Sequence, residues 1–145
     1  MEIYSIGFTK KSASQFFGAL KAHGIERLLD VRLNNTSQLA GFAKQGDLPY
    51  FLEEICGARY EHEPLLAPTQ EILDEYKKRK GSWEVYTKAY LTLIRSRKVE
   101  AEVPKEGFEK KTVLLCSEAA PDRCHRKLAL EYLQQHWGGV VIHHL

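Results

Sequence analysis

The chain has 145 residues, of which 43% are hydrophobic and 28% are charged, and its net charge at pH 7 is +2. This length suits one domain with its own core, and the composition excludes a disordered chain. The small net charge does not by itself indicate nucleic-acid binding, and no apolar run approaches the ~20 residues that span a bilayer. We therefore expect one domain over residues 1–145 and no membrane partner.

The cysteines and the N-terminal segment indicate a reducing compartment. The sequence contains three cysteines and no Cys-x-x-Cys pair, so a disulfide framework is not expected. Cys56 lies in an apolar stretch, which is typical of a small buried hydrophobic residue. The segment from Met1 to Gly7 lacks the basic and long apolar regions of a signal peptide. Together these features predict a cytoplasmic protein.

The first thirty residues predict a strand, a helix and a second strand. The apolar run Ile3–Ile6 ends at a glycine and predicts a buried strand. Ser12 and Gln15 have the spacing of a capping box, so a helix begins there and continues to Gly24. Residues 27–31 predict the second strand. This order of elements builds parallel sheets.

The middle of the chain is less regular. Residues 34–37 and 40–42 predict turns and a loop. Asp47 is a candidate N-cap for a helix through Ile55, and residues 59–62 predict a short strand.

Two further helices follow, each beginning at a hydroxyl residue. Thr69 caps a predicted helix over residues 70–79, and Ser82 opens another with apolar residues on one side. The basic run 77–80 lies between them. We interpret it as a solvated helix end rather than a nucleic-acid patch. The apolar side of the second helix consists of Trp83, Tyr86, Tyr90, Leu93 and Ile94.

The last third repeats the strand, helix and strand order. Residues 112–116 predict a buried strand, Asp122 caps a helix over residues 123–136, and residues 140–142 form a final strand. The sequence thus predicts an α/β fold, a single three-layer domain with a small, mostly parallel sheet of four to five strands flanked by helices.

Three segments follow predicted strands at the edge where open parallel sheets bind ligands. They are Gly7-Phe8-Thr9, Asp30-Val31-Arg32 and Cys116-Ser117-Glu118. Side chains alternate along a strand, so Asp30 and Arg32 point to the same side. A charged pair at this edge is typical of a binding or catalytic site. The alternative is a plain ion pair between them, worth under ~1 kcal/mol at a surface.

The segment from Cys116 to Arg126 holds several side chains that can act in catalysis or ligand binding. Cys124, His125 and Arg126 fall in the first turn of the predicted helix, where the helix dipole favours negative charge. A thiolate there has a lowered pKa, and an oxyanion such as phosphate is favoured for the same reason. A thiolate there leads to covalent catalysis, whereas a bound oxyanion leads to binding alone.

A metal site is the alternative interpretation of the same segment. Cys116, Cys124 and His125, with Glu118 or His62 brought in by folding, offer ligands for zinc or iron. The cysteine spacing matches no zinc finger, and arginines in the same turn repel a cation. Neither a Walker loop nor a Gly-x-Gly-x-x-Gly fingerprint occurs in the sequence.

Four blocks of the sequence resemble the signature blocks of domain-of-unknown-function family 488. The resemblance runs from about residue 3 to the C-terminus, and it implies a compact α/β domain in which the blocks converge. It implies no reaction. The segment Leu65-Leu66-Ala67 departs from the Leu-Gly-Gly that many members carry. The blocks are Ile6-Gly7-Phe8-Thr9, Leu29-Asp30-Val31-Arg32, Tyr60-Glu61-His62 and Leu115-Cys116-Ser117-Glu118 with Cys124-His125-Arg126, and the terminal His144-Leu145 is similar too.

Two functions stay open, together with a structural alternative. The first is an enzyme that acts on a phosphate-bearing or other anionic small molecule, such as a nucleotide, with Asp30 or Glu118 as general acid or base. The second is a non-catalytic module that binds nucleic acid through basic residues, or a zinc or iron ion. The alternative is a buried ion network that ties strand ends together. Candidate catalytic residues are Cys124, Cys116, Asp30, Glu118 and His125, and candidate anion-binding residues are Arg32, Arg126, Thr9, Gly7, His62 and Tyr60.

Overall fold

The computed structural model describes residues 1–34, 41–44, 46–118 and 120–145. Its centre is one five-stranded, all-parallel sheet with the strand order β3-β2-β4-β1-β5. The predicted α/β class and the parallel sheet are therefore confirmed. The strands are β1 (Glu2–Gly7), β2 (Arg27–Asp30), β3 (Arg59–His62), β4 (Thr112–Cys116) and β5 (Val141–His144).

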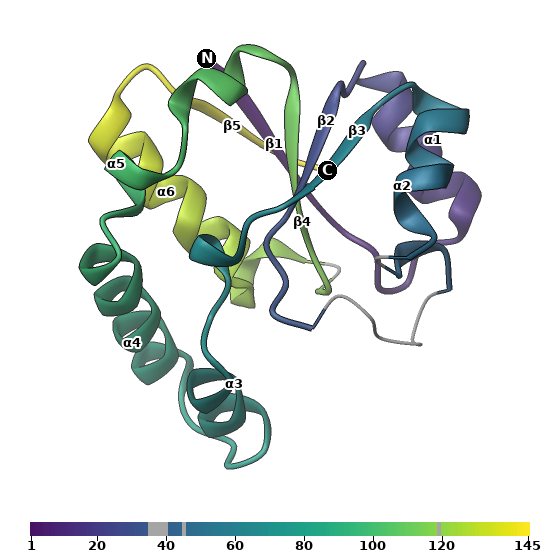
Figure 1. Cartoon of the computed structure of the whole chain (residues 1–145). Helices are drawn as coiled ribbons and strands as arrows, with labels where there is room; N and C mark the ends of the chain where they lie inside the picture. Colours follow the sequence, from purple (N-terminus) through teal and green to yellow (C-terminus); the bar gives the residue numbers. More distant parts are fainter. Residues whose placement is uncertain (35–40, 45, 119) are drawn as a thin grey trace.

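Helices cover both faces of the sheet (Figure 1). On one face α1 packs against the turn that continues α2, and on the other α6 packs against α4 and α5. The α3 helix contacts α4, and this pair extends beyond the carboxyl end of the sheet in Figure 1. The helices are α1 (Ala13–Ala22), α2 (Leu48–Phe51), α3 (Gln70–Lys77), α4 (Trp83–Ser96), α5 (Val99–Glu102) and α6 (His125–Trp137).

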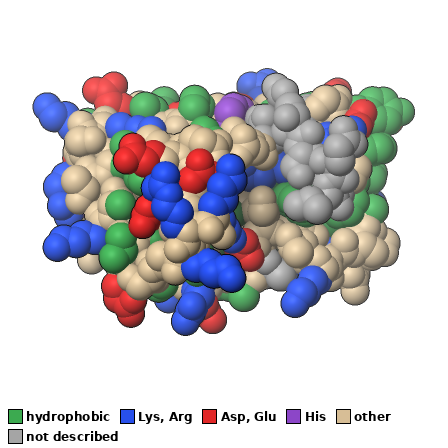
Figure 2. All heavy atoms as spheres, turned by 90° about the horizontal axis from the view of Figure 1, so that it is seen from below, with side chains coloured by type: hydrophobic (Ala, Val, Ile, Leu, Met, Phe, Trp, Pro, Cys, Tyr) green, Lys and Arg blue, Asp and Glu red, His purple; other side chains and the backbone are tan. Residues whose placement is uncertain are grey.

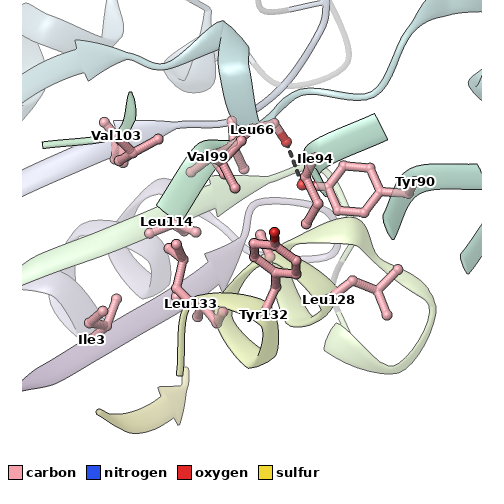
Figure 3. Close-up of a cluster of buried hydrophobic side chains, with 14 of the residues drawn as sticks. Ile3, Leu66, Tyr90, Ile94, Val99, Val103, Leu114, Leu128, Tyr132 and Leu133 are labelled. Carbon is pink, nitrogen blue, oxygen red and sulfur yellow. Dashed lines mark hydrogen bonds between the residues drawn. The ribbon is translucent and has the colours of Figure 1, made fainter. Parts of the chain in front are cut away.

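Each face of the sheet has its own hydrophobic core, because side chains alternate along every strand. In β4, Val113 and Leu115 pack under α1 and α2, whereas Leu114 packs with residues of α4 and α6. Tyr90 of α4 is fully buried in this second core and donates a hydrogen bond of 2.6 Å to the carbonyl of Leu66 (Figure 3). That bond fixes α4 to the segment that follows β3.

Three of the predicted helix starts are confirmed. The amide of Gln15 donates to Ser12 Oγ, while the side chain of Gln15 accepts from the amide of Ser12, which completes the capping box. Thr69 and Ser82 accept the corresponding amide bonds at the starts of α3 and α4. Each side-chain oxygen satisfies an amide that a helix start otherwise leaves without a partner.

The predicted helix from Asp47 through Ile55 agrees with the structure, but the cap bond expected at Asp47 and the helix start expected at Asp122 are wrong. Asp47 precedes α2 but makes no capping bond, and the helix continues as one π-helical turn over Leu52–Cys56. Asp122 lies within a 3₁₀ turn, Pro121–Arg123, and the extended Cys124 is the residue that precedes α6. The predicted turn at 34–37 lies mostly outside the described residues, and the loop at 40–42 lies partly outside them. None of the described helices is long and apolar enough to cross a membrane.

We expect Tyr90→Phe to lower the free energy of unfolding by about 1–3 kcal/mol, because the substitution leaves the carbonyl of Leu66 without its donor in a dry core. Urea unfolding measures the change. Tyr132→Phe is the matched control: its hydroxyl donates to the carboxylate of Glu100 in a partly exposed position, so its loss costs less. Equal losses in the two variants would contradict the role of the buried bond.

Candidate functional site

The candidate site lies where the chain leaves β2 and β4. These neighbouring strands continue in opposite directions, β2 toward β3 and β4 toward β5, which makes this a topological switch point of the kind that binds ligands in open α/β sheets. A pocket of about 100 Å³ opens there. It is lined by Arg32, Leu33, Asn34, Pro68, Leu73, Tyr76, Lys77, Tyr86, Cys116, Ser117, Glu118, Arg123, Cys124 and His125.

Cys116 and Cys124 form a disulfide at the base of this pocket. Cys116 ends β4, Cys124 precedes α6, and both side chains are buried. The sequence analysis did not expect a disulfide framework, and this single bond was not predicted. An odd number of cysteines argued against disulfides, but one of the three, Cys56, is simply free. It is partly buried against the opposite core. The 3₁₀ turn between β4 and α6 brings the sulfur of Cys124 back to that of Cys116.

His125 is held as a neutral imidazole beside the disulfide. Its Nε2 lies 2.8 Å from the carbonyl of Val31, and because a carbonyl only accepts, Nε2 carries the proton. Nδ1 is then the unprotonated nitrogen, and it lies 3.7 Å from Cys116 Sγ. Burial lowers the pKa of His125 to about 4, so the ring is neutral at pH 7. The unshared electron pair of His125 therefore faces the sulfur.

Asp30 and Arg32 bind each other in a buried, two-pronged ion pair. Arg32 donates from Nε to Asp30 Oδ1 and from Nη2 to Oδ2, both at 2.9 Å. Tyr60 donates to the same Oδ2 at 2.6 Å, and Arg32 Nη2 also donates to the carbonyl of Ala43. The carbonyl of Arg32 lies 3.0 Å from Nε2 of His62. Among the described residues, the predicted ion network of Asp30, Arg32, Glu118 and Arg126 is thus reduced to the Asp30–Arg32 pair, because Glu118 pairs with Lys77. Of Asp30, Arg32, Tyr60 and His62, only Arg32 reaches the pocket.

Arg126, Gly7 and Thr9 hold the loop between β4 and α6 across the end of β1. The fully buried Arg126 donates to the carbonyl of Glu118 at 2.6 Å and to Ser5 Oγ at 3.1 Å. A side-chain carbon at Gly7 would lie 1.6 Å from that same carbonyl oxygen. Thr9 donates from its amide and its hydroxyl to the carbonyl of Ser117. These residues, expected to bind an anion, lie outside the pocket lining.

The pocket rim is cationic. Lys77 pairs with Glu118 at 2.6 Å in an exposed ion pair, and Arg123 lies on the same rim. Seen from this end of the sheet, Lys and Arg side chains gather over the middle of the molecule with Asp and Glu among them (Figure 2). Lys77 and Arg123 were not among the predicted ligand residues. Because Lys77 belongs to a basic run at a helix end, the sequence indicated a solvated residue rather than a residue of the pocket.

A family model for the domain of unknown function DUF488 matches residues 12–133. The chain belongs to the DUF488 family. This confirms the family resemblance drawn from the sequence blocks. Neither a curated protein nor a solved structure matches the chain. The pocket of this DUF488 domain brings together five predicted residues, Arg32, Cys116, Glu118, Cys124 and His125, and three of these form a Cys/His cluster.

The buried imidazole makes stability depend on pH. His125 titrates near pH 6.5 when exposed and near 4 when folded, so its contribution is fully present above pH 6.5 and is lost as the pH falls toward 4. We expect this residue to lower the free energy of unfolding by on the order of 3 kcal/mol across that window. Urea unfolding of wild type and His125→Gln at several pH values isolates the effect. Parallel pH profiles for the two proteins would contradict it.

Gly7→Ala is expected to destabilise the fold by about 1–3 kcal/mol or more, because its methyl group collides with backbone rather than with a flexible side chain. Thermal and urea unfolding measure the loss. Gly18→Ala in α1 is the matched control, since nothing lies within 4 Å of its new carbon and alanine favours a helix. A stable Gly7→Ala variant would show that the loop can move away from β1.

Proposed function

We propose that this DUF488 domain is an enzyme whose reduced form uses Cys116 as a nucleophile on a small anionic molecule. One observation carries the proposal: the unprotonated Nδ1 of His125 faces Cys116 Sγ at 3.7 Å, while Nε2 is fixed by the carbonyl of Val31. A nucleophile, a base beside it and a group that orients the base are the parts that covalent catalysis requires.

The surroundings favour a thiolate once the disulfide is reduced. Both sulfurs lie at the start of α6, a helix of 13 residues whose first amides and dipole stabilise negative charge. Lys77 and Arg123 on the rim add positive potential. Between the two cysteines, the position of Nδ1 favours Cys116 as the nucleophile and leaves Cys124 as its disulfide partner.

The size of the pocket defines how much of the substrate it encloses. A cavity of about 150 Å³ holds a benzene molecule. The pocket here has about 100 Å³ and therefore takes one compact group, such as a phosphate or carboxylate, of a molecule that extends beyond it. Exposed ion pairs are worth only about 0–1 kcal/mol, so an anion can replace Glu118 as the partner of Lys77 at little cost.

The reaction follows from these positions. The Cys116 thiol gives its proton to His125 Nδ1, and the sulfur bonds to the electrophilic atom of the substrate. The bond to the leaving group breaks, and the leaving group takes the proton from His125. Water then cleaves the sulfur–substrate bond and restores the thiol. Before this cycle, a dithiol must supply two electrons and two protons to the Cys116–Cys124 disulfide.

Alkylation of the reduced protein tests the proposal. We expect iodoacetamide to modify Cys116 faster than an unperturbed thiol at pH 7, and His125→Gln to slow this reaction about 10-fold or more. Inorganic phosphate should protect the thiol. Peptide mass spectrometry identifies the modified residue, and Cys56→Ser is the control, because Cys56 lies against the opposite core. Slow modification of Cys116, unaffected by His125→Gln, would rule out the nucleophile.

A second candidate function is metal binding by the reduced site. The ligand atoms of Cys116, Cys124 and His125 lie within 4.8 Å of one another, and all three residues are buried. A histidine ligand commonly donates its other nitrogen to a carbonyl, as His125 does to Val31. Thiolate and imidazole ligands suit zinc or iron. Lys77 and Arg123 on the rim oppose a cation, so we place this function second.

Elemental analysis of protein purified under reducing, anaerobic conditions separates the two functions. One equivalent of zinc or iron, lost in Cys116→Ser but retained in Cys56→Ser, would replace the nucleophile with a metal centre. Metal-free protein with a fast-reacting Cys116 supports the enzyme.

The basic run 77–79 provides no specific support for nucleic-acid binding. Its side chains pair with carboxylates of the domain: Lys77 with Glu118, Lys78 with Asp74 and Arg79 with Glu75. These pairs reduce the local positive charge that a phosphate backbone would contact.

A further inference from the structure

One side of the pocket is formed by aromatic side chains of α3 and α4. Tyr76, Trp83 and Tyr86 form this aromatic wall. Tyr86 lies at its centre, with ring centroids 4.9 Å from Trp83 and 5.1 Å from Tyr76. Tyr86 and Tyr76 both line the pocket, as does Glu118. The wall packs on the core through Tyr90, whose ring is stacked with that of Tyr86.

The hydroxyl of Tyr86 differs from those of Tyr90 and Tyr132, two other buried tyrosines. Tyr90 donates to the carbonyl of Leu66 and Tyr132 to Glu100, as buried phenols usually do. Tyr86 is only 5% exposed, and within the described residues its hydroxyl makes no hydrogen bond. In the same part of the chain, the fully enclosed polar side-chain atoms without partners are Arg27 Nη2 and Thr87 Oγ1. The Tyr86 oxygen is not one of them, so it keeps some exposed surface.

The charge of Glu118 relates this hydroxyl to the candidate site. Tyr86 borders both the site pocket and a second hollow between α3 and α4. Burial, then Tyr76 and the carboxylate of Glu118, raise the pKa of Tyr86 well above its usual value. Glu118 lines the site pocket together with Tyr86. The phenol keeps its proton at neutral pH and can therefore donate a hydrogen bond.

We propose that Tyr86 is a ligand-binding residue of this site, and that its hydroxyl donates a hydrogen bond to an oxygen of the anionic group in the pocket. The inference rests on the proposed function, because it assigns a contact to the substrate of that reaction. It also defines the substrate class: a compact oxyanion, phosphate or carboxylate, attached to a part that packs on the aromatic wall. Lys77 and Arg123 supply charge, whereas Tyr86 supplies a fixed direction.

Two measurements on the reduced protein test the assignment, with inorganic phosphate and acetate as probes. The first is the anion concentration that half-protects Cys116 from iodoacetamide. Hydrogen bonds to charged groups are among the strong ones, so Tyr86→Phe should raise this concentration about 10-fold or more. Tyr132→Phe should leave it unchanged, because that hydroxyl donates to Glu100 away from the pocket.

The second measurement is the ¹³Cζ resonance of Tyr86 in tyrosine-labelled protein, assigned by its absence in Tyr86→Phe. We expect one of the two anions to shift this resonance and to leave that of Tyr132 in place. A structural role for Tyr86 would not produce such a shift. Urea unfolding of Tyr86→Phe confirms that the variant is folded.

The outcomes separate this inference from the proposed function. Equal protection in wild type and Tyr86→Phe, or a Tyr86 resonance that neither anion moves, overturns the assignment of Tyr86 even if Cys116 reacts fast. Slow alkylation of Cys116 overturns the thiol enzyme, and an anion-dependent shift of the Tyr86 resonance then still supports the oxyanion contact.

Discussion

The geometry of the site depends on the contact between the carbonyl of Glu118 and the end of β1. Gly7 leaves room for this carbonyl, and Arg126 binds it from inside the domain. The loop after β4 is thereby pressed against the sheet before α6 begins. This path brings Cys124 to Cys116 and places His125 between a sulfur and the carbonyl of Val31. A buried guanidinium is costly to desolvate, and its bonds to Ser5 and Glu118 offset that cost.

Charged residues therefore divide into two groups with different tasks. Asp30, Arg32 and Arg126 are buried, and their bonds join neighbouring segments: the end of β2 to the turn at Ala43, and α6 to β1 and to the loop after β4. Lys77, Glu118 and Arg123 lie at the pocket rim, where water and ligands compete for them. The first group defines the shape of the site, and the second is available to a substrate. Burial, rather than residue type, decides to which group a charge belongs.

Local patterns predicted the fold well and the site in part. The apolar run Thr112–Cys116 matches β4, and the capping box at Ser12 matches the start of α1, because both signals act over a few residues. The sequence also placed Cys124 and His125 at a helix start. It offered the ion pair between Asp30 and Arg32 only as a surface alternative, because two side chains on the same side of a strand do not show whether that side is buried. The sequence placed Tyr86 on the apolar side of a helix. Helical spacing does not distinguish a side chain in the core from one in the wall of a pocket.

The strand order also determines when the domain completes itself during synthesis. β1 leaves the ribosome first, yet its partners are β4 and β5, and Ile3 pairs with Thr112 on one side and Ile142 on the other. Until those segments emerge, its backbone groups have no neighbours in the sheet, and the apolar side chains of α1 lack Val113 and Leu115 of β4, with which they pack. At roughly 5–20 residues per second, the wait lasts several seconds or more. For most of translation, the nascent chain thus holds an apolar strand without its partners, and such unpaired segments favour aggregation.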